Sequence, residues 1–284
     1  MSSASSIAEL LRGHTWVALT GAGLSTDSGI PDYRGPDAPP ANPMLYQEFM
    51  SSAENRRRYW ARSMQGFRSF GVARPNAGHF ALAALAQAPG ADLQGIITQN
   101  VDGLHDAAGS PDVLELHGAI SRVICMNCGE LTSRSDLQVR LEELNPDVEG
   151  TIPAGEAELR SGASKLRPDG DAEVEDWHDF VVADCATCGG LLKPDVVFFG
   201  ESAARPIVKR AFEMVDASDV LVVAGSSLTV MSGLRFVRHQ AKHGRKVVIV
   251  NRGATRGDEF ADLRLESGTS ETLSDLAHLL GHRR

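Results

Sequence analysis

The chain has 284 residues, of which 42% are hydrophobic and 23% are charged, and its formal net charge is −9. This length fits one large α/β domain, alone or with a smaller inserted module, and the composition is that of an ordinary globular protein. The sequence has no broad basic region and no long apolar run, which argues against nucleic-acid and membrane partners, so we expect a cytoplasmic protein.

Predicted strands and helices alternate near both ends of the chain. An apolar, β-branched run at residues 15–20 predicts a buried strand that stops at a glycine turn, and a helix is predicted at 76–88 between two prolines. The other predicted elements, in chain order, are strands at 93–98, 113–116 and 220–224, a helix at 234–243 and a strand at 247–250. This alternation predicts a parallel sheet covered on both faces, with active-site residues beyond the carboxyl ends of its strands.

Two internal regions lack this pattern. Residues 42–70 show no strand signal and are interpreted as short helices. Residues 121–190 hold all four cysteines, and residues 131–184 contain 14 acidic and 5 basic side chains. We interpret the acidic stretch as a solvated, partly disordered loop. The simplest architecture is one doubly wound domain with a small module built from these two regions.

The four cysteines form two CxxC pairs, Cys125 with Cys128 and Cys185 with Cys188. Each CxxC turn can direct two thiolates at one metal, and two such turns complete a tetrahedral zinc site. A redox CxxC or buried free thiols are the alternatives, but paired motifs with no cysteine left over favour zinc. Because protein ligands fill all four positions, one structural zinc per chain is predicted.

A short glycine-rich segment, Gly21-Ala22-Gly23-Leu24-Ser25, follows the first predicted strand. Small residues let backbone amides approach a pyrophosphate, and a helix starting nearby would add a favourable dipole. The segment is not a complete dinucleotide-binding fingerprint, because the acidic residue expected about 20 positions later is missing. The sequence therefore argues against an ordinary dehydrogenase.

A second turn, at residues 29–35, begins and ends with glycine and contains Pro31, and it presents Asp32, Tyr33 and Arg34. It is either a surface turn with an Asp–Arg pair or a loop that covers a bound dinucleotide.

Polar side chains also follow the predicted strands at 93–98 and 113–116. Gln99, Asn100 and Asp102 could hold a ribose or a carboxamide, and His117 follows soon after them. Histidine has the unperturbed pKa needed to accept a hydroxyl proton near neutral pH. His117 is therefore the candidate general base, with Asn100 and Asp102 as its catalytic partners.

Together these segments resemble the sirtuin family. The matching segments, in family order, are GAGLS at 21–25, GIPDYRG at 29–35, TQNVDGLH at 98–105, LHG at 116–118, both CxxC pairs, KPDVVFFGE at 193–201, GSSL at 225–228 and NR at 251–252. The resemblance implies a Rossmann-like doubly wound parallel sheet built from residues 1–40, 75–120 and 191–284. A small helical and zinc-binding domain, residues 41–74 and 121–190, would be inserted into it.

The resemblance also implies which residues bind NAD and an acyl-lysine substrate. The implied NAD contacts are Gly21, Ala22, Gly23, Ser25, Asp32, Tyr33, Arg34, Gln99, Asn100, Asp102, Gly225, Ser226, Ser227, Asn251, Arg252 and Thr269. Val196, Val197 and Phe198 would pair with the substrate peptide as an added strand.

The implied activity is NAD-dependent protein lysine deacylation. The acyl group would move from lysine to ADP-ribose, with release of nicotinamide and O-acyl-ADP-ribose, and His117 would remove a ribose hydroxyl proton. A protein mono-ADP-ribosyltransferase and a non-catalytic NAD or ADP-ribose sensor are the alternatives. Neither the oligomeric state nor the protein substrates can be derived from the sequence.

The identity of the acyl group is also open. Tyr33, Lys193 and Phe198 look more like class II sirtuins, including the type linked to lipoyl and other long acyl groups. Tyr59 and Arg62 keep a Tyr-x-x-Arg spacing that could grip an acidic acyl tail, since arginine binds carboxylates bidentately. The preferred interpretation is that both residues serve helix packing and surface charge.

Overall fold

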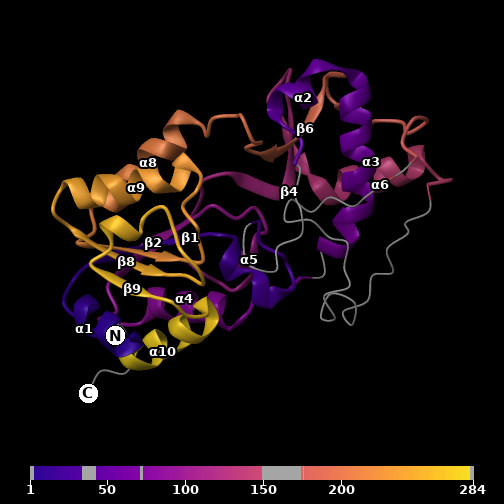
Figure 1. Ribbon diagram of the computed structural model, residues 1–284. Coiled ribbons are helices and arrows are strands. Elements are labelled where there is room, and N and C mark those ends of the chain that lie inside the picture. The colour runs from indigo at the N-terminus through magenta and orange to yellow at the C-terminus, as the bar shows by residue number, and fades with distance from the viewer. Residues whose placement is uncertain (1–2, 34–42, 71–72, 149–173, 175, 282–284) are drawn as a thin grey trace.

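The computed structural model describes residues 3–33, 43–70, 73–148, 174 and 176–281. Two sheets organise them (Figure 1). A six-stranded parallel sheet has the order β3-β2-β1-β7-β8-β9, and a three-stranded antiparallel sheet has the order β5-β4-β6. No helix within the described ranges has both the length and the apolar character needed to cross a bilayer.

The parallel sheet is built outward from two central strands, β1 (Trp16–Thr20) and β7 (Val220–Ala224), in which every residue is buried. Its other strands are β2 (Leu93–Thr98), β3 (Val113–Glu115), β8 (Lys246–Val250) and β9 (Leu263–Leu265). The strand order reverses direction between β1 and β7. Open α/β sheets bind ligands beyond the carboxyl ends of the strands at such a switch point.

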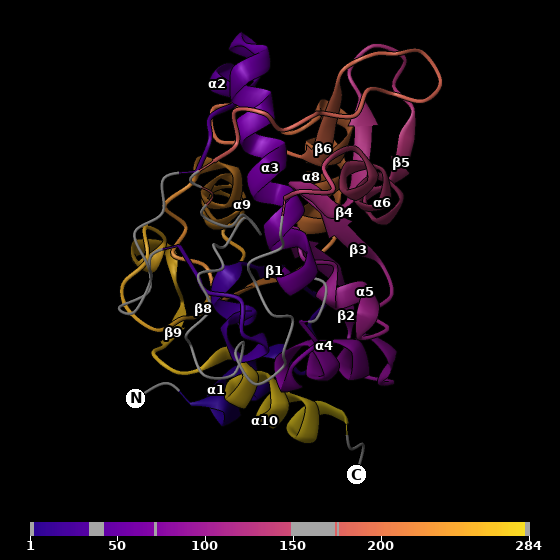
Figure 2. The ribbon, with the colours of Figure 1, turned by 90° about the vertical axis from the view of Figure 1, so that its right-hand side faces the viewer.

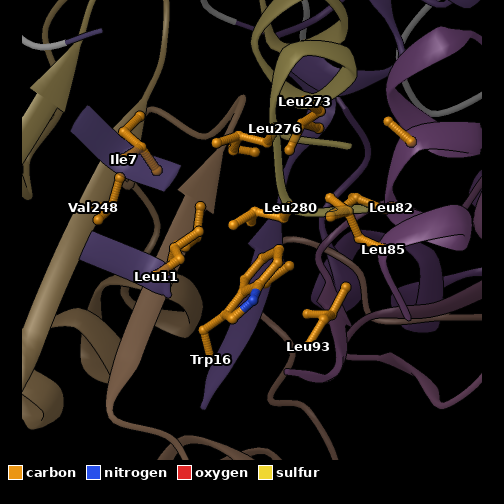
Figure 3. Packing of buried hydrophobic residues seen from close by; sticks show 14 of the residues in the cluster. Ile7, Leu11, Trp16, Leu82, Leu85, Leu93, Val248, Leu273, Leu276 and Leu280 are labelled. Carbon is orange, nitrogen blue, oxygen red and sulfur yellow. The ribbon is translucent and has the colours of Figure 1, made fainter. Parts of the chain in front are cut away.

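Helices cover both faces of this sheet (Figure 1). One face carries α1 (Ala4–Leu11), α4 (Ala77–Gln87) and α10 (Thr269–Gly281), whose leucines surround Trp16 in Figure 3. The other face carries α8 (Arg205–Asp216) and α9 (Met231–Lys242). Because strand side chains alternate in direction, Trp16 and Ala18 pack on the first face, whereas Val17 and Leu19 pack on the second.

The antiparallel sheet belongs to a second packed unit, which we call the cysteine module. Its strands are β4 (Gly118–Cys125), β5 (Leu131–Ser133) and β6 (Leu192–Val196), and its helices are α2 (Tyr46–Ser51), α3 (Ala53–Phe70) and α6 (Arg134–Leu144). Figure 2 shows α3 running alongside this sheet. Trp60 of α3 is fully buried there among Val123, Leu137 and Leu192, so the helices and the cysteine region share one core.

Two sequence interpretations are wrong in this module. Residues 42–70 do not form only short helices, because α3 alone has 18 residues. The start of the acidic stretch is not a loop, because residues 134–144 form α6 and bury Leu137 and Leu141. Residues 149–173 and 175 lie outside the described residues. The domain boundaries stay a prediction.

Candidate active site and metal centre

A cavity of about 600 Å³ opens at the carboxyl ends of β1 and β7, in the size range of small-molecule sites. Most of the residues predicted to bind ligands line it. The predicted residues that line the cavity are Gly21, Ala22, Gly23, Ser25, Asp32, Tyr33, Tyr59, Gln99, Asn100, Asp102, His117, Val196, Val197, Phe198, Gly225, Ser226, Ser227, Asn251 and Arg252. Arg34 lies outside the described residues.

The cavity floor is a crossing of two glycine-containing backbones. The amide of Gly23 donates to the carbonyl oxygen of Gly225 at 2.9 Å. Gly225 has φ +67°, and a Cβ there would lie 2.4 Å from the backbone nitrogen of Leu24. A Cβ on Gly21 would lie 2.8 Å from the same Gly225 carbonyl. Only glycine permits this approach, which leaves the floor as bare backbone.

The loop after β1 differs from the sequence expectation in one respect. Residues Ala22–Leu24 and Thr26–Ser28 form two short 3₁₀ turns in place of an α-helix. A single turn has little aligned dipole, so any attraction for a phosphate comes mainly from local backbone amides. Thr269, at the start of α10, donates its hydroxyl to the Gly23 carbonyl oxygen at 3.2 Å. Thr269 thus supports the loop from behind and is not among the cavity-lining residues.

Asn100 and Asp102 are held by a continuous set of hydrogen bonds. Asn100 Nδ2 donates to the Gly21 carbonyl oxygen at 3.2 Å and to Ser25 Oγ at 3.1 Å. Ser25 Oγ donates to Asp102 Oδ2 at 2.7 Å, and the Leu104 amide donates to Asp102 Oδ1 at 2.9 Å. Burial raises the pKa of Asp102, while these donors oppose the shift by stabilising the carboxylate. Both side chains are therefore oriented before any ligand arrives.

His117 has a defined partner at each ring nitrogen. Its Nδ1 lies 2.8 Å from the carbonyl oxygen of Gln99, which can only accept, so Nδ1 carries the proton. Its Nε2 lies 2.9 Å from Ser232 Oγ and is the basic nitrogen. Burial lowers the pKa of His117, the bond to Gln99 opposes this, and the charge of Arg235 lowers it further. His117 is consequently held as a neutral imidazole in one tautomer.

The segment after β6 forms the wall opposite the glycine floor. Gly118, with φ +75°, pairs with Val196, and the amide of Val197 donates to the His117 carbonyl oxygen at 2.8 Å. β6 is an edge strand of its sheet. The segment is braced by buried Lys193, whose Nζ lies 3.1 Å from Glu201 Oε2 and 4.8 Å from the Phe198 ring centroid.

Tyr59 and Arg62 lie on the same helix, α3, but only Tyr59 is among the described residues that line the cavity. Tyr59 is buried, its ring centroid lies 5.3 Å from those of both Phe49 and Phe198, and it reaches the cavity. Arg62 is not one of the described residues that line the cavity. The ring contacts of Tyr59 agree with a role in packing, whereas the role of Arg62 stays a prediction.

Ser232 and Arg235 of α9 are among the described cavity-lining residues that were not singled out in the sequence. They carry no local motif. Their positions depend on how α9 packs across the end of the sheet. Ser232 lies 115 residues along the chain from His117.

The four cysteines converge away from this cavity, and none of them lines it. Their sulfur atoms all lie within 4.8 Å of one another, with 3.5 Å between Cys125 and Cys188 and 3.9 Å between Cys128 and Cys185. Sulfurs on a tetrahedron around zinc would be about 3.8 Å apart, whereas a disulfide needs about 2 Å. The donor set therefore fits a four-thiolate zinc centre.

Both CxxC turns have the same backbone form. The amide of Gly129 donates to the Cys125 carbonyl and that of Gly189 to the Cys185 carbonyl, each at 2.9 Å. Both glycines have positive φ, at +76° and +68°. Because protein ligands would occupy every position, such a zinc would stabilise the fold and would not activate water.

Comparisons with known proteins agree with this geometry. The model of the Sir2 family matches residues 21–232. The chain is 53% identical to NAD-dependent protein deacetylase 1 of Mycobacterium avium, over 94% of this chain and 92% of that protein. It is 50% identical to NAD-dependent protein deacetylase 1 of Streptomyces coelicolor, over 98% of this chain and 90% of that protein.

A solved structure of a Sir2 with a p53 peptide and NAD⁺ superposes with a TM-score of 0.71, at 29% identity and 96% coverage of both chains. Because the family model matches most of the chain and two relatives are at least 50% identical to it, this protein belongs to the Sir2 family.

Proposed function

We propose that this protein is an NAD-dependent protein lysine deacylase that moves the acyl group from lysine to ADP-ribose and releases nicotinamide. The observation that carries the proposal is His117, a neutral base of fixed tautomer at the wall of a cavity that also presents Asn100 and Asp102. The similarity to proteins named NAD-dependent deacetylases supports the same activity.

The cavity residues fit NAD. Its pyrophosphate would lie over the bare backbone of the crossing between Gly23 and Gly225, a space that a Cβ would fill. Ser226, Ser227, Asn251 and Arg252 would hold the adenosine half, and Gln99, Asn100 and Asp102 the nicotinamide ribose. Asn251 Nδ2 donates to the carbonyls of Arg252 and Gly253, which shapes that end of the site. Bound NAD would supply an electrophilic ribose carbon and a ribose hydroxyl.

The proton chemistry follows from the tautomer of His117. Nε2 would accept the proton of a ribose hydroxyl, and that oxygen would then be free to attack the acyl carbon. Nδ1 keeps its proton and its bond to the Gln99 carbonyl, which stabilises the imidazolium that forms. The low pKa of His117 keeps the base unprotonated and ready near neutral pH.

The acyl-lysine substrate would enter along the edge strand β6. Residues Val196, Val197 and Phe198 continue this edge, so an extended peptide could add to it through backbone hydrogen bonds. The Sir2 with a bound p53 peptide supports a peptide partner of this kind. The cytoplasmic location stays a prediction.

The test is mass spectrometry of the purified protein with NAD and lysine peptides carrying acetyl, succinyl, lipoyl or long-chain acyl groups. We expect O-acyl-ADP-ribose and free lysine from the wild type, and neither product from His117→Ala, which should still bind NAD. The peptide turned over fastest identifies the acyl class. Cleavage of NAD or labelling of protein with ADP-ribose, without deacylation, would favour the transferase instead.

A further inference from the structure

The first turn of α9 packs directly against the residue that orients the base. Gly233 is buried, and a Cβ on it would lie 2.7 Å from Gln99 Oε1. The side-chain amide of Gln99 donates to Ser226 Oγ at 2.8 Å, and the backbone carbonyl of Gln99 accepts from His117 Nδ1. The absence of a side chain at residue 233 thus lets α9 approach the end of β2 closely enough to reach His117.

Ser232 completes this contact. Its hydroxyl lies 2.9 Å from His117 Nε2, so the imidazole is held between the Gln99 carbonyl and α9. A hydroxyl can donate to a neutral ring nitrogen and can accept from a protonated one. Ser232 can therefore bond Nε2 in either protonation state whenever no ribose hydroxyl occupies that position.

Arg235 lies one turn further along the same helix face, since residues three apart are neighbours on a helix. It lines the cavity, and its Nε donates to the Met231 carbonyl at 3.3 Å. Within the described part of the chain, it forms no ion pair with a carboxylate. The other ionisable described side chains that line the cavity are Asp32, Tyr33, Tyr59, Asp102, Glu201 and Arg252.

We propose that Ser232 and Arg235 are positioning residues that act on the catalytic base. Ser232 is the resting partner of Nε2, to be replaced by the ribose hydroxyl, and Arg235 supplies a positive charge that disfavours the imidazolium. The proposal deepens the proposed deacylase function and rests on it. No motif identifies either residue, because both act through the packing of α9.

The experiment compares the wild-type enzyme with Ser232→Ala, Ser232→Thr, Arg235→Gln and the control Arg238→Gln. Arg238 is an exposed residue of the same helix and does not line the cavity. Deacylation is measured from pH 5.5 to 9 by product formation. Exchange of labelled nicotinamide into NAD is measured in parallel. In the proposed reaction nicotinamide leaves before His117 removes the ribose hydroxyl proton, so this exchange does not need the base. The titration of His117 is followed independently by NMR.

Loss of a contact that orients the base should lower kcat about tenfold in Ser232→Ala, with nicotinamide exchange and the KM for NAD little changed. Ser232→Thr restores the hydroxyl and should recover most of that loss. Removing the like charge in Arg235→Gln should raise the pKa of His117. The acid limb of kcat/KM should move to higher pH with it, whereas Arg238→Gln should match the wild type.

Equal losses of exchange and deacylation in Ser232→Ala would show a structural role and overturn the proposal, as would wild-type kcat in that variant. An unchanged His117 titration in Arg235→Gln would overturn the role proposed for Arg235. If the wild type produces no deacylated peptide, the proposed function fails, and the NMR titrations still decide whether α9 controls the protonation of His117.

Discussion

The glycine-lined cavity and the cysteine centre bring their binding residues together in different ways. The cysteine centre uses two short turns with the same backbone form, each with a glycine at positive φ. The cavity draws residues from the ends of β1, β2, β7 and β8 and from α9. The comparison teaches that a metal can join two local motifs, whereas a cofactor site needs a sheet to bring distant loops together.

The largest difference between the two regions should appear on metal removal. Metal binding to four thiolates contributes about 10–16 kcal/mol in isolated zinc peptides, so the cysteine module should lose its packing without it. We expect Cys185→Ser to lower the zinc content and to speed hydrogen exchange in β4 and β6. Strands β1 and β7 should stay more protected, since they pack in the two large apolar clusters on either face of the parallel sheet. Equal exchange in both sheets would show that the metal stabilises the whole chain.

A second test targets the glycine crossing of the cavity. Gly225 and Gly244 both have φ +67°, but a Cβ at Gly244 would meet no atom within 4 Å. Gly244→Ala should therefore cost only the left-handed backbone conformation, about 1–2 kcal/mol. Gly225→Ala adds a backbone clash, so we expect about 2–5 kcal/mol in all and a loss of NAD binding. Urea unfolding measures the stability of each variant, and NAD titration measures its binding. Equal effects of the two substitutions would show that the glycine crossing is not needed for NAD binding.

A third test concerns the buried histidine pair behind the cavity. His79 and His105 have ring centroids 5.0 Å apart, and His105 Nε2 lies 2.9 Å from Thr20 Oγ1. Burial lowers the pKa of His79 to about 4 and that of His105 to about 3, the latter helped by His79. As the pH falls, the unfolded chain takes up protons on these histidines before the folded protein does. Their contribution to the free energy of unfolding is therefore complete above about pH 6.5 and is lost as the pH falls towards 4.

The size of this effect follows from the same linkage. At pH 5.5 each histidine should reduce the free energy of unfolding by about 1.4 kcal/mol relative to neutral pH. His105→Gln keeps a hydrogen-bonding side chain next to Thr20 but removes one titrating ring. Urea unfolding at pH 7.5 and 5.5 should therefore show a smaller decrease in the variant. If the decrease is unchanged, groups elsewhere cause the acid sensitivity.

The smallest effect compares two helix caps. Asn76 caps α4 and also donates from Nδ2 to the Leu24 carbonyl at 2.7 Å, whereas Ser133 only caps α6. Replacing either by alanine should cost about 1–2 kcal/mol. Only Asn76→Ala should also raise the KM for NAD, because it releases the loop after β1. A similar KM increase in Ser133→Ala would contradict the separation of the two regions.

Strand positions and local turns could be predicted from the sequence because they depend on neighbouring residues. The buried β-branched runs became β1, β2, β7 and β8, and both CxxC pairs formed turns of the predicted kind. The helix at 76–88 was also confirmed, as α4. The polar residues after each strand met in one cavity, because parallel strands end at the same edge of the sheet.

What the sequence determined by itself was the set of local signals: which segments are buried strands, which thiolates can share a metal, and which base follows which strand. Tertiary structure decided how the parts meet. The length of α3, the burial of α6 and the contact of Ser232 with His117 all depend on packing between distant segments. Local backbone preferences come from adjacent residues, but which neighbours a helical side chain meets is decided by what that helix packs against.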